Sequence, residues 1–262
     1  MNIALDPINR TGITVDQYRE RFGKELENDG KEASRQEALC PVCLQSLGLK
    51  AVLAPMRRYT IFSHKPRSNF CPLKKPAGKK YEVLPPASYN PHVAQNLRAS
   101  FFVNWRYHWL QFKSYLGAAD IKDFIDVVRF ADKKHLWRYQ GILENEIPYV
   151  LLVLKHFAPV INHKGEVFRK SWVSCWFEGS LQSLGDFWNK RSVAPARIVR
   201  LSYDYPKNET ATNIMNNDHL TSIDPVVLNI TFLPSSGSTV TPPNVPAFVV
   251  KKMNAAFPGD AF

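Results

Sequence analysis

Three cysteines and one histidine in the first third of the chain have the types and spacing of metal ligands. Cys40 and Cys43 are separated by two residues, and His64 and Cys71 follow after gaps of 20 and 6 residues. Thiolate sulfur and imidazole nitrogen are the ligands that zinc prefers in tetrahedral sites. Four protein ligands leave no open position for a substrate. The pattern therefore predicts a Zn²⁺ ion that stabilises the fold without catalysing a reaction.

Two other interpretations of the same residues stay open. The cysteines could be buried free thiols, with His64 an unrelated surface residue. The Cys40-Pro-Val-Cys43 pair could also form a redox motif, although no alternation of strands and helices of the thioredoxin type surrounds it. The added histidine and third cysteine favour the metal site over both alternatives.

Positive charge is concentrated around these ligands. The formal net charge of the chain is +11, and residues 31–80 hold eleven basic and two acidic residues, which gives +9 for that segment. Such a segment indicates a polyanionic partner, because phosphate contacts from lysine and arginine provide affinity without sequence choice. A solvated charged face, or an interface with an acidic partner protein, is the alternative. The candidate nucleic-acid-binding residues are Arg57, Arg58, Lys65, Arg67, Lys74 and Lys75, with Tyr59, Phe62 and Phe70 as candidates for stacking on unpaired bases.

The cysteine-bearing segment resembles a known region. Cys40-Pro-Val-Cys43, the stretch from Arg58 to His64 (RYTIFSH) and Cys71-Pro72 are similar to the N-terminal zinc-finger region of competence CoiA-like proteins, over about residues 38–73. In that family the finger precedes a nuclease domain, so the resemblance implies DNA handling in a bacterial or mobile-element setting. A nuclease motif is not recognisable after residue 80. The resemblance is therefore carried over for the four metal ligands alone.

The organisation of the chain predicts an α+β fold: a small zinc-binding module, a helical middle and a β-rich C-terminal part. We expect residues 1–39 to be a polar lead-in with one helix beginning at residues 14–16, residues 40–80 to be the zinc-binding basic module, and residues 81–262 to form a mixed domain. The expected elements are short strands at 51–53 and 59–62, helices over 92–116, 120–136 and from 148, strands over 168–177, 198–205 and 226–232, and a short helix over 181–188.

Three further groups could carry chemistry, and each has a simpler explanation. The aromatic stripe around Phe101 and Trp109 could stack on bases, but its helical spacing is more typical of a core that also packs His108. Asp120, Asp123 and Asp126 could hold a nuclease cation. Their place in the first turns of a helix already has a capping and dipole explanation. The remaining cysteine, Cys175, lies in an aromatic strand and is expected to be a core thiol.

The composition and the cysteines also suggest where the protein works. No apolar run reaches the roughly 18 residues that a membrane-spanning helix needs, and no secretory signal is visible. Clustered cysteines with metal-site spacing fit a reducing compartment, so we expect a cytoplasmic location without a membrane partner.

The function predicted from the sequence is a zinc-stabilised, non-catalytic nucleic-acid-binding protein, with DNA favoured over RNA, that acts in a prokaryotic DNA transaction such as defence or a mobile element. Two alternatives remain: a divergent metal-dependent nuclease, and a protein-interaction subunit that docks on an acidic partner.

Overall fold

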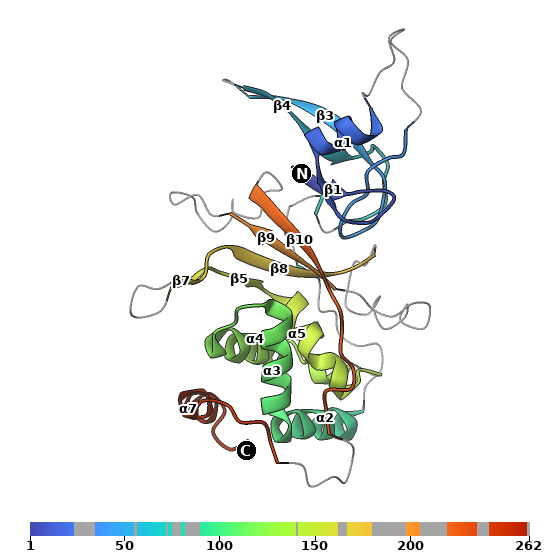
Figure 1. Cartoon of the computed structure of the whole chain (residues 1–262). Coiled ribbons are helices and arrows are strands. Elements are labelled where there is room, and N and C mark those ends of the chain that lie inside the picture. The colour runs from blue at the N-terminus through green and yellow to red at the C-terminus, as the bar shows by residue number, and fades with distance from the viewer. Residues whose placement is uncertain are drawn as a thin grey trace.

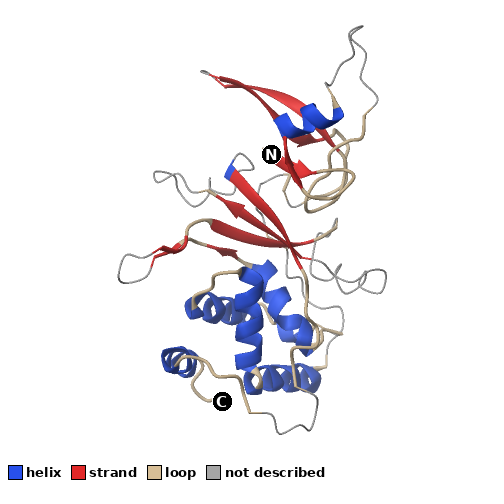
Figure 2. Cartoon of the chain, viewed as in Figure 1, coloured by secondary structure: helices blue, strands red, loops and turns tan. Residues whose placement is uncertain are grey.

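The computed structural model describes residues 1–23, 35–54, 57–71, 73–74, 80–81, 90–139, 141–161, 167–179, 198–204, 219–234 and 241–260. Helices and strands are mixed, which confirms the α+β prediction. An N-terminal part with short strands lies on one side of a four-stranded sheet, and most of the helices lie on the other side (Figures 1 and 2).

The N-terminal part is built from two hairpins and one helix. Strands β1 (Ile3–Leu5) and β2 (Gly12–Thr14) pair antiparallel, and α1 (Val15–Phe22) follows at once. Thr14 caps α1 with a capping box, so the helix expected at this position is confirmed. Strands β3 (Leu47–Ala54) and β4 (Arg57–His64) form the expected hairpin, longer at both ends than the apolar runs indicated.

The helical middle contains α2 (Pro91–Val103), α3 (Trp105–Leu116), α4 (Ile121–Lys133) and α5 (Ile147–Leu154), with short 3₁₀ turns at Leu136–Arg138 and Glu144–Glu146. The prediction of one continuous helix over 92–116 is wrong, because the chain leaves helical geometry at Asn104. The side-chain amide of Asn104 instead donates a hydrogen bond to Glu144. The apolar stripe survives the break, and its members between Phe101 and Leu116 are buried, whereas Val93 is exposed.

The sheet has the order β10–β9–β8–β5, and all of its pairings are antiparallel. Its strands are β5 (His156–Phe157), β8 (Trp172–Phe177), β9 (Ile198–Tyr203) and β10 (Leu220–Val226), and a small hairpin of β6 (Val160–Ile161) and β7 (Val167–Arg169) leads into β8. Side chains alternate between the two faces of the sheet along each strand. Phe157 of β5 lies on the face that contacts Phe112 of α3. Trp176 of β8 lies on the opposite face, against Tyr81.

The C-terminal part differs from its prediction in three places. The single strand expected over 168–177 is two strands, β7 and β8, separated at Lys170 and Ser171. The strand expected over 226–232 is wrong, since β10 ends at Val226 and Val227 is 90% exposed. The segment that follows pairs with helices instead: Tyr115 forms hydrogen bonds to the backbone of Asn229, and Asn145 donates to the carbonyl of Ile230. The chain then forms α7 (Ala247–Ala256), a helix that the sequence did not indicate and that packs on α4. The helix expected over 181–188 lies outside the described residues.

Candidate metal centre

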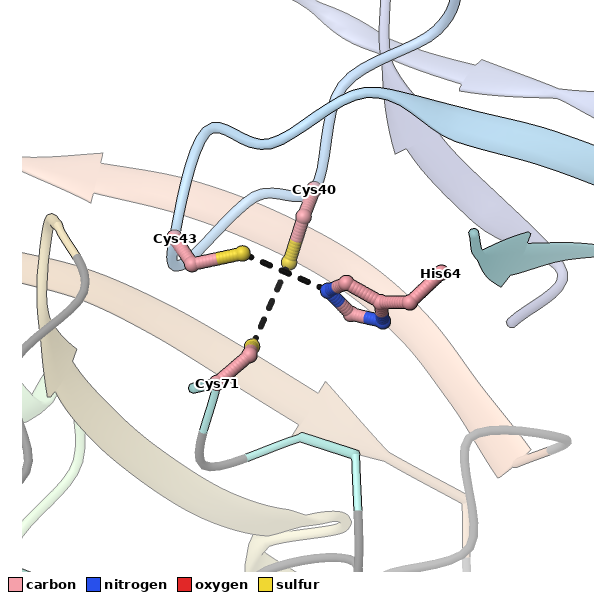
Figure 3. Close-up of side chains that lie close together, drawn as sticks. All are labelled: Cys40, Cys43, His64 and Cys71. Carbon is pink, nitrogen blue, oxygen red and sulfur yellow. Dashed lines mark hydrogen bonds between the residues drawn. The ribbon is translucent and has the colours of Figure 1, made fainter. Parts of the chain in front are cut away.

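The four predicted ligands come from three separate segments and converge on one point. Cys40 and Cys43 flank a tight turn just before β3, which is closed by the Leu44 amide donating to the Cys40 carbonyl. His64 is the last residue of β4, and Cys71 follows seven residues later in a loop. Figure 3 shows their side chains pointing toward a common centre. Turn, hairpin and loop thus each contribute one side of the site.

The distances fit a tetrahedral ion. All four ligand atoms lie within 4.8 Å of one another, with the Cys40 and Cys71 sulfurs 3.7 Å apart and the Cys43 sulfur 3.3 Å from His64 Nε2. Two sulfurs bound tetrahedrally to one ion at about 2.3 Å would be separated by about 3.8 Å. Cys40, Cys43, His64 and Cys71 therefore have the geometry to hold one metal ion with four protein ligands.

The three cysteine thiols are buried, so all three can ionise together only if a cation at the site balances their negative charge. Cys40, Cys43 and Cys71 are all buried. Burial raises the pKa of the Cys40 thiol well above its usual range, whereas hydrogen bonds from Cys40 and Cys71 lower the pKa of Cys43. Without an ion, the cluster thus favours one thiolate held by neighbouring thiols. A divalent cation would supply the positive charge that lets all three sulfurs bind as thiolates.

The acidic residues weighed as a nuclease site do not converge on a common point. Asp120 caps α4, and Asp123 completes its capping box while pairing with Arg169. Among the residues that the structure describes, the Cys₃His set is the one group with metal-site geometry. Cys175 is fully buried in β8, as expected for a core thiol. His108 is fully buried as well, with Nε2 3.1 Å from Glu144.

The structure places the six candidate basic residues in different situations. Lys65 and Arg67 are exposed; Lys65 pairs with Glu37, and its hydrogen bond lowers the pKa of that carboxyl group. The Lys74 ammonium instead donates to the carbonyls of Ser68 and Asn69, so it holds the backbone of the loop that precedes it. The side chains of Arg57 and Arg58, and the whole of Lys75, lie outside the described residues.

The three aromatic residues that were candidates for base stacking also differ in their exposure to solvent. Phe62 is only 1% exposed and packs edge-on against Tyr18, so the prediction that it stacks on bases is wrong. Side chains alternate between the two faces of β4, and Phe62 lies on the face that packs into the core of the N-terminal part. Tyr59 is half-buried, and Phe70 is 40% exposed beside the ligand Cys71.

Several contacts that the sequence did not indicate connect the Cys40–Cys43 turn and the segment after Cys71 to the four-stranded sheet. The carbonyl of Val42, within the turn, accepts a 2.6 Å hydrogen bond from Gly179 after β8. Tyr81 stacks on Phe177, and its hydroxyl donates to the Phe177 carbonyl and accepts from the Phe177 amide. Lys80 is the last lysine of the basic segment 31–80. Its ammonium instead donates to Ser174 and to the carbonyl of Cys175, above the ring of Trp176.

Lys80 gives a pH-dependent prediction. Burial lowers the pKa of Lys80 to about 7, far below its value in an unfolded chain. Between pH 7 and 8.5 the unfolded state then binds more protons than the folded state, so the free energy of unfolding should rise with pH. The slope is up to about 1.4 kcal/mol per pH unit. Denaturant unfolding of the metal-loaded protein at several pH values measures it.

The Lys80→Met variant should lose this contribution, while Lys113→Met, which removes an exposed lysine of α3, should keep the wild-type slope. Because other groups titrate as well, the difference between variant and wild type is the quantity to compare. Parallel curves for Lys80→Met and the wild type would show that Lys80 keeps its proton in the fold.

Comparison of the chain with known protein families, curated proteins and solved structures gives no match. The resemblance of residues 38–73 to the CoiA-like finger therefore stays a prediction. None of the helices in the described ranges has the length and apolar character needed to cross a membrane.

Proposed function

We propose that the site binds Zn²⁺ and that the protein is a zinc-stabilised nucleic-acid-binding protein without catalysis by the metal. Three thiolates and one imidazole form a ligand set typical of structural zinc. The four cysteines are free, which is compatible with metal binding in a reducing compartment such as the cytoplasm.

The observation that carries the proposal is the position of the ligand loop, residues 65–70, between two metal ligands. His64 precedes the loop and Cys71 follows it, so an ion at the site fixes both of its ends. Lys65 and Arg67 are displayed on this loop in solvent. Small metal-bound modules depend on their ion for folding, so the metal would hold these cations in place for phosphate groups.

The partner follows from charge. Residues 31–80, the segment of the sequence that contains the ligand loop, carry +9, and a polyanion is the partner that such a segment attracts. The surface pair of Lys65 with Glu37 is no obstacle, because an exposed ion pair is worth about 0–1 kcal/mol and a phosphate can replace the carboxylate. We propose DNA as the nucleic acid, in a prokaryotic DNA transaction, as the resemblance to the CoiA-like finger implies.

The double variant Lys65→Gln/Arg67→Gln tests this proposal. We expect weaker binding to DNA and a flatter salt dependence, with the slope of log K against log salt reduced by about 1.8 on duplex DNA or about 1.4 on a single strand for two lost phosphate contacts. Fluorescence anisotropy with a labelled oligonucleotide between about 50 and 200 mM salt measures both quantities.

A matched control is Lys113→Gln/Lys122→Gln, which removes two exposed lysines from the helical middle and should leave the slope unchanged. Equal slopes for the two double variants would place the contact surface elsewhere. If the purified protein bound neither DNA nor RNA but kept an acidic protein partner after nuclease treatment, the nucleic-acid proposal would be abandoned.

A further inference from the structure

The ligand loop carries one exposed aromatic residue in addition to its two exposed cations. Phe70 is 40% exposed and lies directly before the ligand Cys71, on the same short loop as Lys65 and Arg67. Exposed phenylalanines also occur elsewhere in the chain, for example Phe168 on β7. Phe70 differs from Phe168 because it shares its loop with exposed basic side chains and a metal ligand.

The backbone around Phe70 is held from two sides. Gln45, just after the Cys40–Cys43 turn, donates its side-chain amide to the carbonyls of Asn69 and Phe70 at 3.4 and 3.2 Å. Lys74 donates to the Ser68 carbonyl at 2.7 Å and to its hydroxyl at 2.8 Å. The ring is thus presented by a backbone that is already ordered, which lowers the entropy that binding has to overcome.

We propose that the ligand loop binds single-stranded nucleic acid, with an unpaired base stacked on Phe70 and the neighbouring phosphates paired with Lys65 and Arg67. This inference rests on the proposed function and adds the strandedness of its partner. Phosphates are present in single strands and duplexes alike, whereas the face of a base is open for stacking only when the base is unpaired. Basic side chains alone, without an aromatic ring, would favour neither the single strand nor the duplex.

The test measures the affinity of the metal-loaded protein for a 20-nucleotide DNA strand, for the same sequence as a duplex, and for the matching single-stranded RNA. We expect the single strands to bind more tightly than the duplex. Phe70→Ala should weaken single-strand binding by about tenfold while changing duplex binding little. Phe70→Trp should retain or strengthen single-strand binding, since its larger ring stacks as well.

Two controls separate stacking from folding. Phe168→Ala removes an exposed ring of similar accessibility that lies on β7, outside the ligand loop, and should leave both affinities unchanged. Metal content close to one equivalent in each variant shows that the site is intact. Tighter binding to the duplex, or equal losses for Phe70→Ala on both forms, would overturn the single-strand inference alone. Absence of binding to all three probes would overturn the proposed function together with it.

Discussion

Cys71→Ser is expected to leave the protein without a stoichiometric metal ion and with its N-terminal part unfolded. The hydroxyl of serine is a poor zinc ligand, so three ligands would remain around a buried position. The core of the N-terminal part includes three of the ligands themselves, Cys40, Cys43 and Cys71, with Val42, Leu47 and Phe62 also buried in it. Structural zinc contributes on the order of 10 kcal/mol to small modules of this kind, so its loss should exceed what that core can supply.

Elemental analysis and limited proteolysis measure the two parts of this result. The wild type should contain about one equivalent of zinc, and Cys71→Ser well below that, with new cleavage within residues 1–80. Cys175→Ser is the matched control, since it changes an equally buried cysteine that lies outside the cluster. If Cys71→Ser kept its metal and its resistance to protease, the site would not be the structural centre proposed.

The second large effect is expected at Arg169, the last residue of β7. Its side chain is 4% exposed and pairs with both carboxylate oxygens of Asp123, at 2.9 and 3.3 Å. It also donates to the carbonyls of Ala118 and Ala158. Arg169 thereby joins the start of α4 to β7. Replacement by methionine would remove this donor from the Ala118 and Ala158 carbonyls and leave the partly buried Asp123 carboxylate with the Asp120 amide of its capping box but without its cation.

We expect Arg169→Met to lower the free energy of unfolding by about 3 kcal/mol, as removal of one partner from a buried ion pair typically does. Denaturant unfolding followed by tryptophan fluorescence gives the value. Lys170→Met is the control, because the neighbouring lysine is exposed and its removal should cost less than about 0.5 kcal/mol. Equal values for the two variants would mean that Asp123 finds other donors.

Local rules predicted the elements that depend on a few adjacent residues. Residues 14–16 predicted the start of α1, where the structure shows a capping box at Thr14, and Asp120 with Asp123 predicted the start of α4, because each cap is formed within one turn of helix. The break at Asn104 could not be predicted in this way. At the break, Asn104 donates to Glu144, forty residues away, and the sequence spacing does not reveal such a contact.

The alternation of apolar residues along the chain predicted the strand over 226–232 wrongly, again because the contacts that decide the structure come from distant segments. The apolar period of residues 226–232 suits a strand, yet the segment lies along α3 and ends in hydrogen bonds to Tyr115 and Asn145. A period of two shows only that alternate side chains have different surroundings. Which partner provides those surroundings is decided by packing.

The sequence by itself identified the four candidate metal ligands. Cysteine and histidine can bind a metal because of their side-chain chemistry, and the loops between them can have many lengths and still bring them together. Only the tertiary structure decided what the surrounding side chains are free to do. Lys80 and Phe62 turn inward, and Lys74 secures its own loop, while Lys65, Arg67 and Phe70 remain in solvent. Charge and aromatic character are properties of the residue. Exposure depends on contacts made by segments distant in the chain, such as β8 and Tyr18, so it appears only once they are folded together.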